Sequence, residues 1–191
     1  MIRPRSDARR AAAARRLLDS RDGAVAVEFA LIFPVMLTLF FGSFEVTNLL
    51  SANLKMTAAA ASAAELAAGA TSLTPAQLDS FGAAATLVMT PLAPSGLKLA
   101  FASVVNGGPA GTPVVAWHYE QNGAAPIASH GLDDAALEKL GSGSVILVQA
   151  TYDYSSPLSF VLSKTYTLTD KAYAAPRSVD EVSCSGCPQG G

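Results

Sequence analysis

Histidine, cysteine and charged side chains are scarce in this chain. Its 191 residues include two histidines, two cysteines and only 15% charged residues. Catalysis requires convergent reactive groups, and no Ser-His-Asp arrangement, phosphate-binding glycine loop or cluster of metal ligands stands out. His118 alternates with Trp117 and Tyr119 in an expected strand, which favours an ordinary position on a sheet surface. We therefore expect no catalytic residue, no metal and no cofactor.

The few charges are unevenly distributed. Seven arginines and three aspartates precede residue 23, a net charge of +4, which leaves −6 for the rest of the chain. An acidic body repels polyanions, so nucleic acid is disfavoured as a partner. The basic arm instead precedes the one long apolar run, and arginines beside such a run are retained in the cytoplasm. We expect the N-terminus inside the cell and the body outside.

The apolar run is long enough to cross a bilayer. Residues 29–44 contain no charged side chain, and residues 24–27 extend the run to about 21 residues. A cleavable secretory signal would be shorter and would end in a small-x-small site, for which residues 51–53 are a poor candidate. The sequence therefore predicts a single-pass membrane protein, with its C-terminal domain outside the cytoplasm.

Two residues interrupt the run. Glu28 is near its start, where an unpaired carboxylate in lipid costs a few kcal/mol, unless it remains hydrated among the headgroups. Pro34 lacks an amide donor, so it either kinks the helix or is simply tolerated, as proline often is in membrane helices.

The segment Gly23-Ala24-Val25-Ala26-Val27-Glu28-Phe29 resembles the processing site of type IV prepilins. The aromatic residue after the glutamate is similar to the Flp (type IVb) variant. This resemblance implies that a prepilin peptidase cleaves between Gly23 and Ala24. It also implies that Glu28, with Phe29, sets the register between subunits, because its carboxylate pairs with the new ammonium of Ala24, often on a neighbouring subunit.

Two longer blocks carry a family resemblance. Residues 21–50 and residues 145–177 are similar to the two ends of TadE/TadG-like proteins, the minor pilins or pseudopilins of the Tad (tight adherence) system. TadE is the closer likeness, and a TadF-like position remains open. The resemblance implies a role in pilus assembly or initiation and in surface adhesion. It also implies a place in the bacterial inner membrane, with the C-terminal domain in the periplasm. It implies four kinds of partner: the prepilin peptidase, other pilins and minor pilins, inner-membrane platform proteins and membrane lipid.

The remaining sequence predicts an α+β, pilin-like fold. The membrane helix continues to about Ala68, because alanine favours helix and no glycine intervenes after Gly42; its alanines offer a close-packing face. Thr74-Pro75 begins a second helix that ends near Val88. A short helix is expected at 133–140 and a hairpin turn at 107–111. Strands are expected at four places: 97–105, 113–121, 144–154 and 164–173. We expect an antiparallel four-stranded meander packed on the long helix.

The expected domain organisation has four parts. They are a basic cytoplasmic leader (1–23), a transmembrane and extended helix (24–69), an extracytoplasmic domain (70–176) and a C-terminal tail (177–191). The tail contains Cys184 and Cys187. A redox motif would need a following helix and zinc would need two more ligands. In an oxidising compartment a local disulfide is the first choice, ahead of free thiols or an intermolecular bond.

Two other classes of function compete with the minor pilin. One is an unprocessed, membrane-anchored binding or assembly-factor domain. The other is a secreted or anchored enzyme, which a polar pocket with perturbed pKa values would identify.

Overall fold

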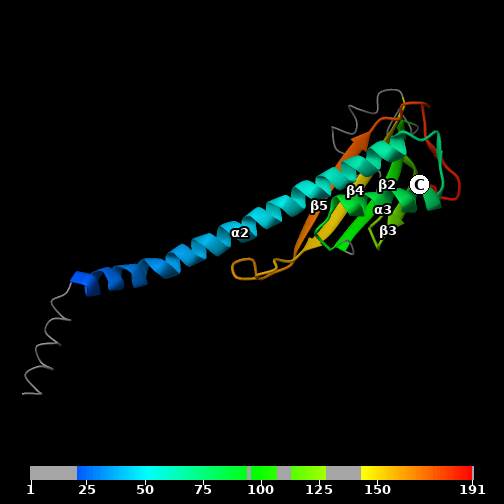
Figure 1. The fold of residues 1–191 in the computed structure, drawn as a ribbon. Helices are drawn as coiled ribbons and strands as arrows, with labels where there is room; N and C mark the ends of the chain where they lie inside the picture. Colours follow the sequence, from blue (N-terminus) through cyan, green and yellow to red (C-terminus); the bar gives the residue numbers. More distant parts are fainter. Residues whose placement is uncertain (1–20, 94–95, 107–112, 128–142, 191) are drawn as a thin grey trace, which may run out of the picture.

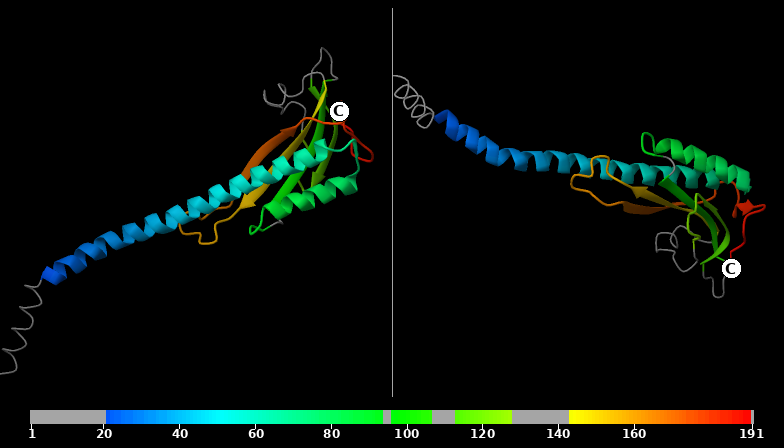
Figure 2. Two further views of the ribbon diagram at one scale, coloured as in Figure 1. Left: turned by 45° about the horizontal axis from the view of Figure 1, so that its top comes forward. Right: turned by 90° about the horizontal axis from the view of Figure 1, so that it is seen from below.

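One long helix carries a compact sheet domain on its C-terminal half (Figure 1). The computed structural model describes residues 21–93, 96–106, 113–127 and 143–190. Helix α2 runs from Arg21 to Ala68, 48 residues or roughly 72 Å at 1.5 Å per residue. Its N-terminal half projects from the domain (Figure 2). The predicted α+β class, with a long helix followed by a small antiparallel four-stranded sheet, is confirmed.

The alanine-rich half of α2 packs onto the sheet and onto helix α3, Pro75–Val88. Small side chains let the helix backbone approach its neighbours closely. The buried residues of this half recur every three or four positions. They are Ala52, Met56, Ala59, Ala60, Ala63, Ala64, Ala67 and Ala68. The predicted packing face is therefore used within the domain itself.

Helix α3 begins as the sequence predicts. Thr74 is its N-cap, and the amide of Gln77 donates to the Thr74 hydroxyl over 3.4 Å. In return, the Gln77 side chain accepts from the amide of Thr74 over 3.0 Å. This reciprocal capping box satisfies two amide donors that a helix N-terminus would otherwise leave without partners.

The main sheet contains the four predicted strands but not in the predicted order. The strands are β2 (Leu97–Asn106), β3 (Pro113–Gln121), β4 (Ser144–Tyr154) and β5 (Tyr166–Ala174). All neighbours are antiparallel, and the order is β3-β2-β4-β5. The expected meander is wrong, because β2 lies between β3 and β4.

Burial explains this order. In β2 and β4 consecutive side chains are buried, so both faces of these strands are covered. One face packs on α2, and the other forms a second cluster that includes Ala102, Val115 and Leu147. Strands β3 and β5 are partly exposed and form the edges. The two most continuously apolar strands thus take the two central positions.

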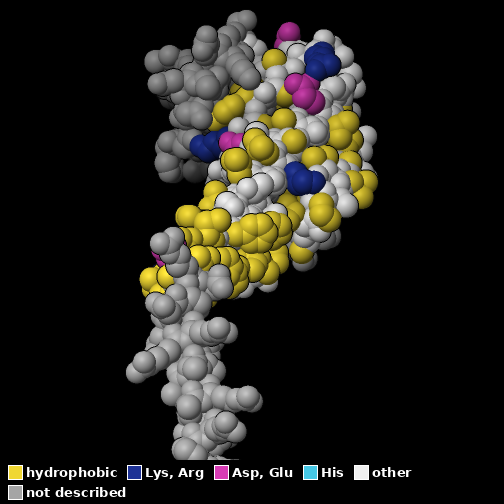
Figure 3. Space-filling view, turned by 60° about the vertical axis from the view of Figure 1, so that its left-hand side comes forward, with side chains coloured by type: hydrophobic (Ala, Val, Ile, Leu, Met, Phe, Trp, Pro, Cys, Tyr) yellow, Lys and Arg dark blue, Asp and Glu magenta, His cyan; other side chains and the backbone are white. Residues whose placement is uncertain are grey.

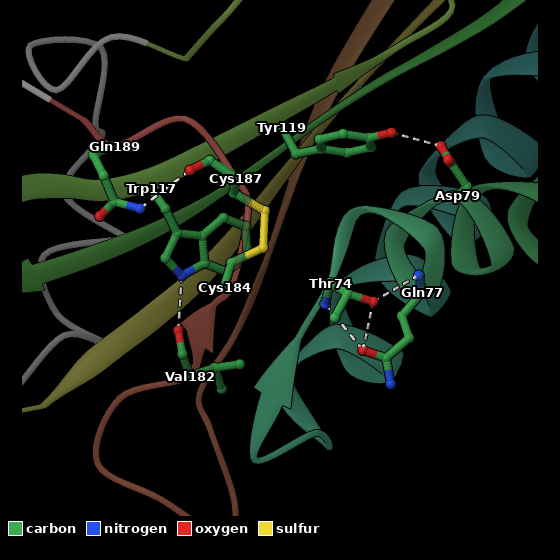
Figure 4. The surroundings of a disulfide bond; sticks show 9 residues. All are labelled: Thr74, Gln77, Asp79, Trp117, Tyr119, Val182, Cys184, Cys187 and Gln189. Carbon is green, nitrogen blue, oxygen red and sulfur yellow. Dashed lines mark hydrogen bonds between the residues drawn. A yellow bond between two sulfur atoms is a disulfide. The ribbon is translucent and has the colours of Figure 1, made fainter.

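The C-terminal segment is bound to the domain rather than separate from it (Figure 4). Strand β6 (Ser183–Cys184) pairs in parallel with β1 (Ser72–Leu73). The indole Nε1 of buried Trp117 donates to the carbonyl of Val182 over 2.7 Å. The amide of Arg177 donates to the last carbonyl of α2, that of Ala68, over 3.3 Å.

Several expectations lie outside the described residues. They are the basic leader up to residue 20, the turn at 107–111 and the helix at 133–140; the second histidine of the chain, His130, also lies there.

Candidate functional site

The residues of the expected processing site lie on the projecting half of α2. Gly23 and Ala24 are within the helix, and a Cβ built at Gly23 meets no atom within 4 Å. Glycine costs about 0.5–1 kcal/mol relative to alanine inside a helix. Nothing in the described part of the chain therefore requires a glycine at this position.

Glu28 and Phe29 are exposed on the same part of the helix. In the described residues no hydrogen-bond donor or cation pairs with the Glu28 carboxylate, and Phe29 contacts the ring of Phe33, with 5.3 Å between centroids. Ala24 and Glu28 are four positions apart, so they lie on one face of the helix. A carboxylate without a partner in its own chain needs one from elsewhere or from water.

Helix α2 continues through Pro34 without interruption. The hydroxyl of Thr38 donates to the Pro34 carbonyl over 2.9 Å, a bond that an ordinary helix of this composition also makes. A kink at Pro34 therefore stays a prediction.

The projecting part of α2 is apolar and uncovered. The helix is long and apolar enough to span a membrane, and its most apolar window is not buried against the domain. Its exposed hydrophobic side chains run from Val25 to Phe44 and continue at Val46, Leu50 and Leu54. In Figure 3 the hydrophobic side chains gather where the helix leaves the domain. A helix of this kind is suited to anchor the domain to a membrane.

The first buried side chain along α2 is a carboxylate, that of Glu45. Four donors converge on it from the loop between β4 and β5. The amides of Phe160, Val161 and Leu162 each donate to a carboxylate oxygen over 2.7 Å, and the hydroxyl of Ser156 donates over 2.9 Å. An ionised carboxylate only accepts hydrogen bonds, so its lone pairs match this set of donors.

Sequence reasoning missed this contact. Glu45 directly follows the uncharged run of residues 29–44, and its partners are 111 to 117 residues further along the chain. The available signal was weak. It consists of one glutamate that ends the apolar run and a second apolar segment, residues 157–162, without any charge.

Apolar contacts accompany the hydrogen bonds of this loop. The ring of Phe160 packs on that of Phe41, with 5.5 Å between centroids. Val161 lies over Gly42: a Cβ added to Gly42 would be 3.6 Å from the Cγ2 atom of Val161. The loop therefore lies along α2 on the side of Glu45 that leads to the apolar half of the helix, as all views show (Figures 1 and 2).

An ion pair lies at the end of the sheet from which the loop leaves. Lys98 on β2 pairs with Asp153 on β4 over 3.0 Å, and the hydroxyl of Thr167 donates to the same carboxylate over 2.8 Å. The hydrogen bonds from Lys98 and Thr167 hold the pKa of Asp153 below its usual range. This end of the sheet therefore presents a neutral ion pair rather than a free carboxylate.

A cavity of about 600 Å³ opens above the loop. Phe44 and Lys55 of α2, Leu92 and Tyr152 are among the residues that line it. The Lys55 ammonium donates to the carbonyl of Thr90 at its wall. The cavity has the size of a small-molecule site.

The two cysteines lie far from these residues, at the opposite end of the domain. Cys184 and Cys187 are joined by a disulfide, the first of the alternatives that the sequence offered (Figure 4). Both are buried in the main core together with Trp117. The disulfide therefore links residues of the C-terminal segment, whose strand β6 pairs with β1 just beyond the end of α2.

One histidine, His118, is among the described residues. His118 lies on β3 beside Glu120, with Nδ1 and Oε1 2.5 Å apart. No group of three or more histidine, cysteine, aspartate or glutamate side chains able to hold a metal occurs in the part of the chain that the structure describes.

The comparisons with known proteins single out the same helix. Residues 23–65 match the family model described as TadE-like protein. This match supports a relationship to a pilus-related family of structural proteins, and it covers the projecting helix and its alanine-rich continuation. The second expected block of resemblance, residues 145–177, lies outside the matched segment. No curated protein and no solved structure matches the chain.

The contact between Glu45 and the loop yields a direct prediction. Replacing Glu45 by alanine favours helix in α2 but leaves the amides of Phe160, Val161 and Leu162 without acceptors. We expect hydrogen exchange at these three amides to accelerate roughly tenfold or more, measured by mass spectrometry on the detergent-solubilised protein. The matched control is Glu65→Ala, an exposed position of the same helix, which should leave the loop unchanged. Unchanged exchange in Glu45→Ala would contradict the contact.

Proposed function

We propose that the protein is a non-catalytic minor pilin of a Tad pilus system, in a TadE-like position. In this proposal, residues 1–23 remain in the cytoplasm until a prepilin peptidase cleaves after Gly23, and the domain lies outside the inner membrane. The processed helix then packs against other pilins, with the platform proteins of the membrane as further partners. The subunit helps to start or extend the pilus that mediates adhesion.

The observation that carries this proposal is the length of the uncovered apolar face. Exposed hydrophobic side chains extend from Val25 to Leu54, a helix length of roughly 45 Å. A bilayer covers only about 30 Å of hydrocarbon. A core of about 20 residues that begins between residues 25 and 29 ends between residues 44 and 48. At least Leu50 and Leu54, which follow Val46 at a spacing of four, therefore present an apolar stripe beyond it. A neighbouring helix is the partner that such a stripe fits.

The TadE-like match over residues 23–65 supports the proposal independently, because it covers the helix that would pack in the pilus. The structure of Gly23 supports the processing step. This glycine has no role in the described fold, so the requirement for it would come from a protease that fits the backbone closely.

The processing step is tested at Gly23. In cells with active prepilin peptidase, the wild-type protein should begin at Ala24, and Gly23→Leu should keep residues 1–23 because its side chain blocks the close fit. The fold should persist, since a Cβ at this position meets no atom. Intact-mass measurement of the membrane-extracted protein reads the result. Gly42→Ala, in the same helix, is the matched control and should be processed. A wild-type chain that begins at Met1 would overturn this step.

The role of Glu28 is tested by Glu28→Gln. We expect this change to leave the stability of the domain unaltered, because Glu28 has no partner in the described residues, and to abolish recovery of the protein in sheared pili. The matched control is Glu65→Gln on the same helix, which loses only an exposed ion pair with Arg177. Such a pair contributes about 1 kcal/mol or less. Normal incorporation of Glu28→Gln would contradict the proposed registration.

The apolar stripe is tested by Leu50→Asp. A carboxylate on the stripe should prevent a neighbouring helix from packing there, at a cost of several kcal/mol for an unpaired charge in an apolar interface. We expect crosslinking to other pilins in intact membranes to be lost. Leu87→Asp, on an exposed position of α3, is the control and should crosslink like the wild type. Equal crosslinking of both variants would argue against the stripe as an interface.

One observation favours the alternative of an unprocessed, membrane-anchored binding domain. It is the cavity above the loop, whose volume suits a small ligand. The Gly23 and Glu28 experiments separate the two functions, because a binding domain needs neither residue for its activity.

A further inference from the structure

The loop between β4 and β5 has an apolar tip that the domain does not cover. Leu158, Phe160 and Val161 are 47%, 57% and 48% exposed. Residues 154–163 contain no charged side chain, and Lys164 follows directly. Single exposed hydrophobic residues are common on protein surfaces, but three within four residues at the end of one loop form a patch.

The depth of this patch follows from its contacts with α2. Phe160 packs on Phe41, and Val161 lies over Gly42. About 20 helical residues cross the hydrocarbon core. If the core begins at Val25, it ends at Phe44; if it begins after Glu28, it ends at Asn48. In either position of the helix, the side chains of Phe160 and Val161 lie at or within the outer boundary of the core.

At this depth the loop backbone needs internal partners. Amides without acceptors are costly in a membrane, and non-helical backbone is tolerated there only where protein groups satisfy it. Glu45 accepts from the three amides of Phe160 to Leu162. The carboxylate also needs these donors, because an unpaired charge at the boundary is costly. The Glu45 carboxylate therefore offsets the desolvation cost of the loop amides, and the amides offset that of the carboxylate.

We propose that the β4–β5 loop is a second membrane-contacting element, which inserts Leu158, Phe160 and Val161 into the outer boundary of the bilayer beside the helix. Glu45 clamps the loop in this position. The domain then contacts the bilayer at two points, which restricts the tilt of α2 relative to the membrane. Lys164, which directly follows the uncharged segment and is exposed, supplies an ammonium for lipid phosphates.

Lipid is the occupant because the patch continues the surface of the spanning helix. The exposed side chains of Phe40 and Phe44 lie on α2 next to the loop contacts, and Figure 3 shows hydrophobic side chains gathered over this end of the domain. A bilayer that covers these phenylalanines also reaches the loop. The inference rests on the membrane-spanning role of α2, but it depends neither on processing nor on assembly into a pilus.

The test measures contact between lipid tails and labelled side chains. The full chain, with its disulfide intact, is reconstituted at a low protein-to-lipid ratio in phosphatidylethanolamine and phosphatidylglycerol vesicles that contain brominated acyl chains. An environment-sensitive fluorophore is attached at Leu158→Cys. The matched control is Leu87→Cys, an exposed leucine of α3 that lies outside the proposed boundary. Leu39→Cys, in the spanning part of α2, reports whether the helix is inserted.

We expect strong bromine quenching at positions 39 and 158 and none at 87. Quenching at 39 without quenching at 158 would overturn the proposal while leaving the membrane helix intact. Loss of quenching at both would instead count against the spanning helix itself.

The role of the clamp is tested in the same labelled protein. Glu45→Gln places amide hydrogens against the loop amides, so the loop should leave the boundary and quenching at 158 should fall to the level at 87. Glu65→Gln should have no effect. Equal quenching at 158 with and without Glu45→Gln would refute the clamp, and unchanged quenching at position 39 shows that the variant is still inserted.

Discussion

The carboxylate of Glu45 connects the two halves of the molecule. Along α2 it is the first side chain that is fully buried, and it is bound to backbone amides rather than to a cation. On its N-terminal side the helix is apolar and uncovered, and on its C-terminal side the helix forms the core of a domain. Glu45 therefore lies where one continuous helix changes from an uncovered apolar surface to a packed core, and its hydrogen bonds fix the β4–β5 loop at that level.

Much of the fold could be predicted because its signals are local. The length of α2 follows from an uncharged run and an alanine-rich continuation, and the start of α3 follows from the capping threonine and the proline after it. The four strands follow from β-branched and aromatic residues. These features depend on neighbours within a few residues, so a single sequence contains enough information for them.

The order of the strands and the Glu45 contact could not be predicted in the same way. The meander assumed that strands adjacent in sequence are adjacent in the sheet, whereas burial on both faces places β2 and β4 at the centre. The partners of Glu45 are main-chain amides more than 110 residues away. Almost every residue has such an amide, so the residue types of the loop do not reveal this contact. The site residues predicted from the sequence do not form one common site. Gly23 and Glu28 lie on the projecting half of α2, whereas Cys184 and Cys187 lie at the other end of the molecule.

The manner in which the chain returns to the end of α2 has a mechanical consequence. The amide of Arg177 bonds to Ala68, and β6 pairs with β1 directly beyond the helix, so the far end of α2 is fastened to the rest of the domain. The alanine-rich face lies along the sheet from Ala52 to Ala68. Tension applied along the helix would load this interface in shear. Its contacts would have to slide together, which resists force better than contacts that peel apart one after another.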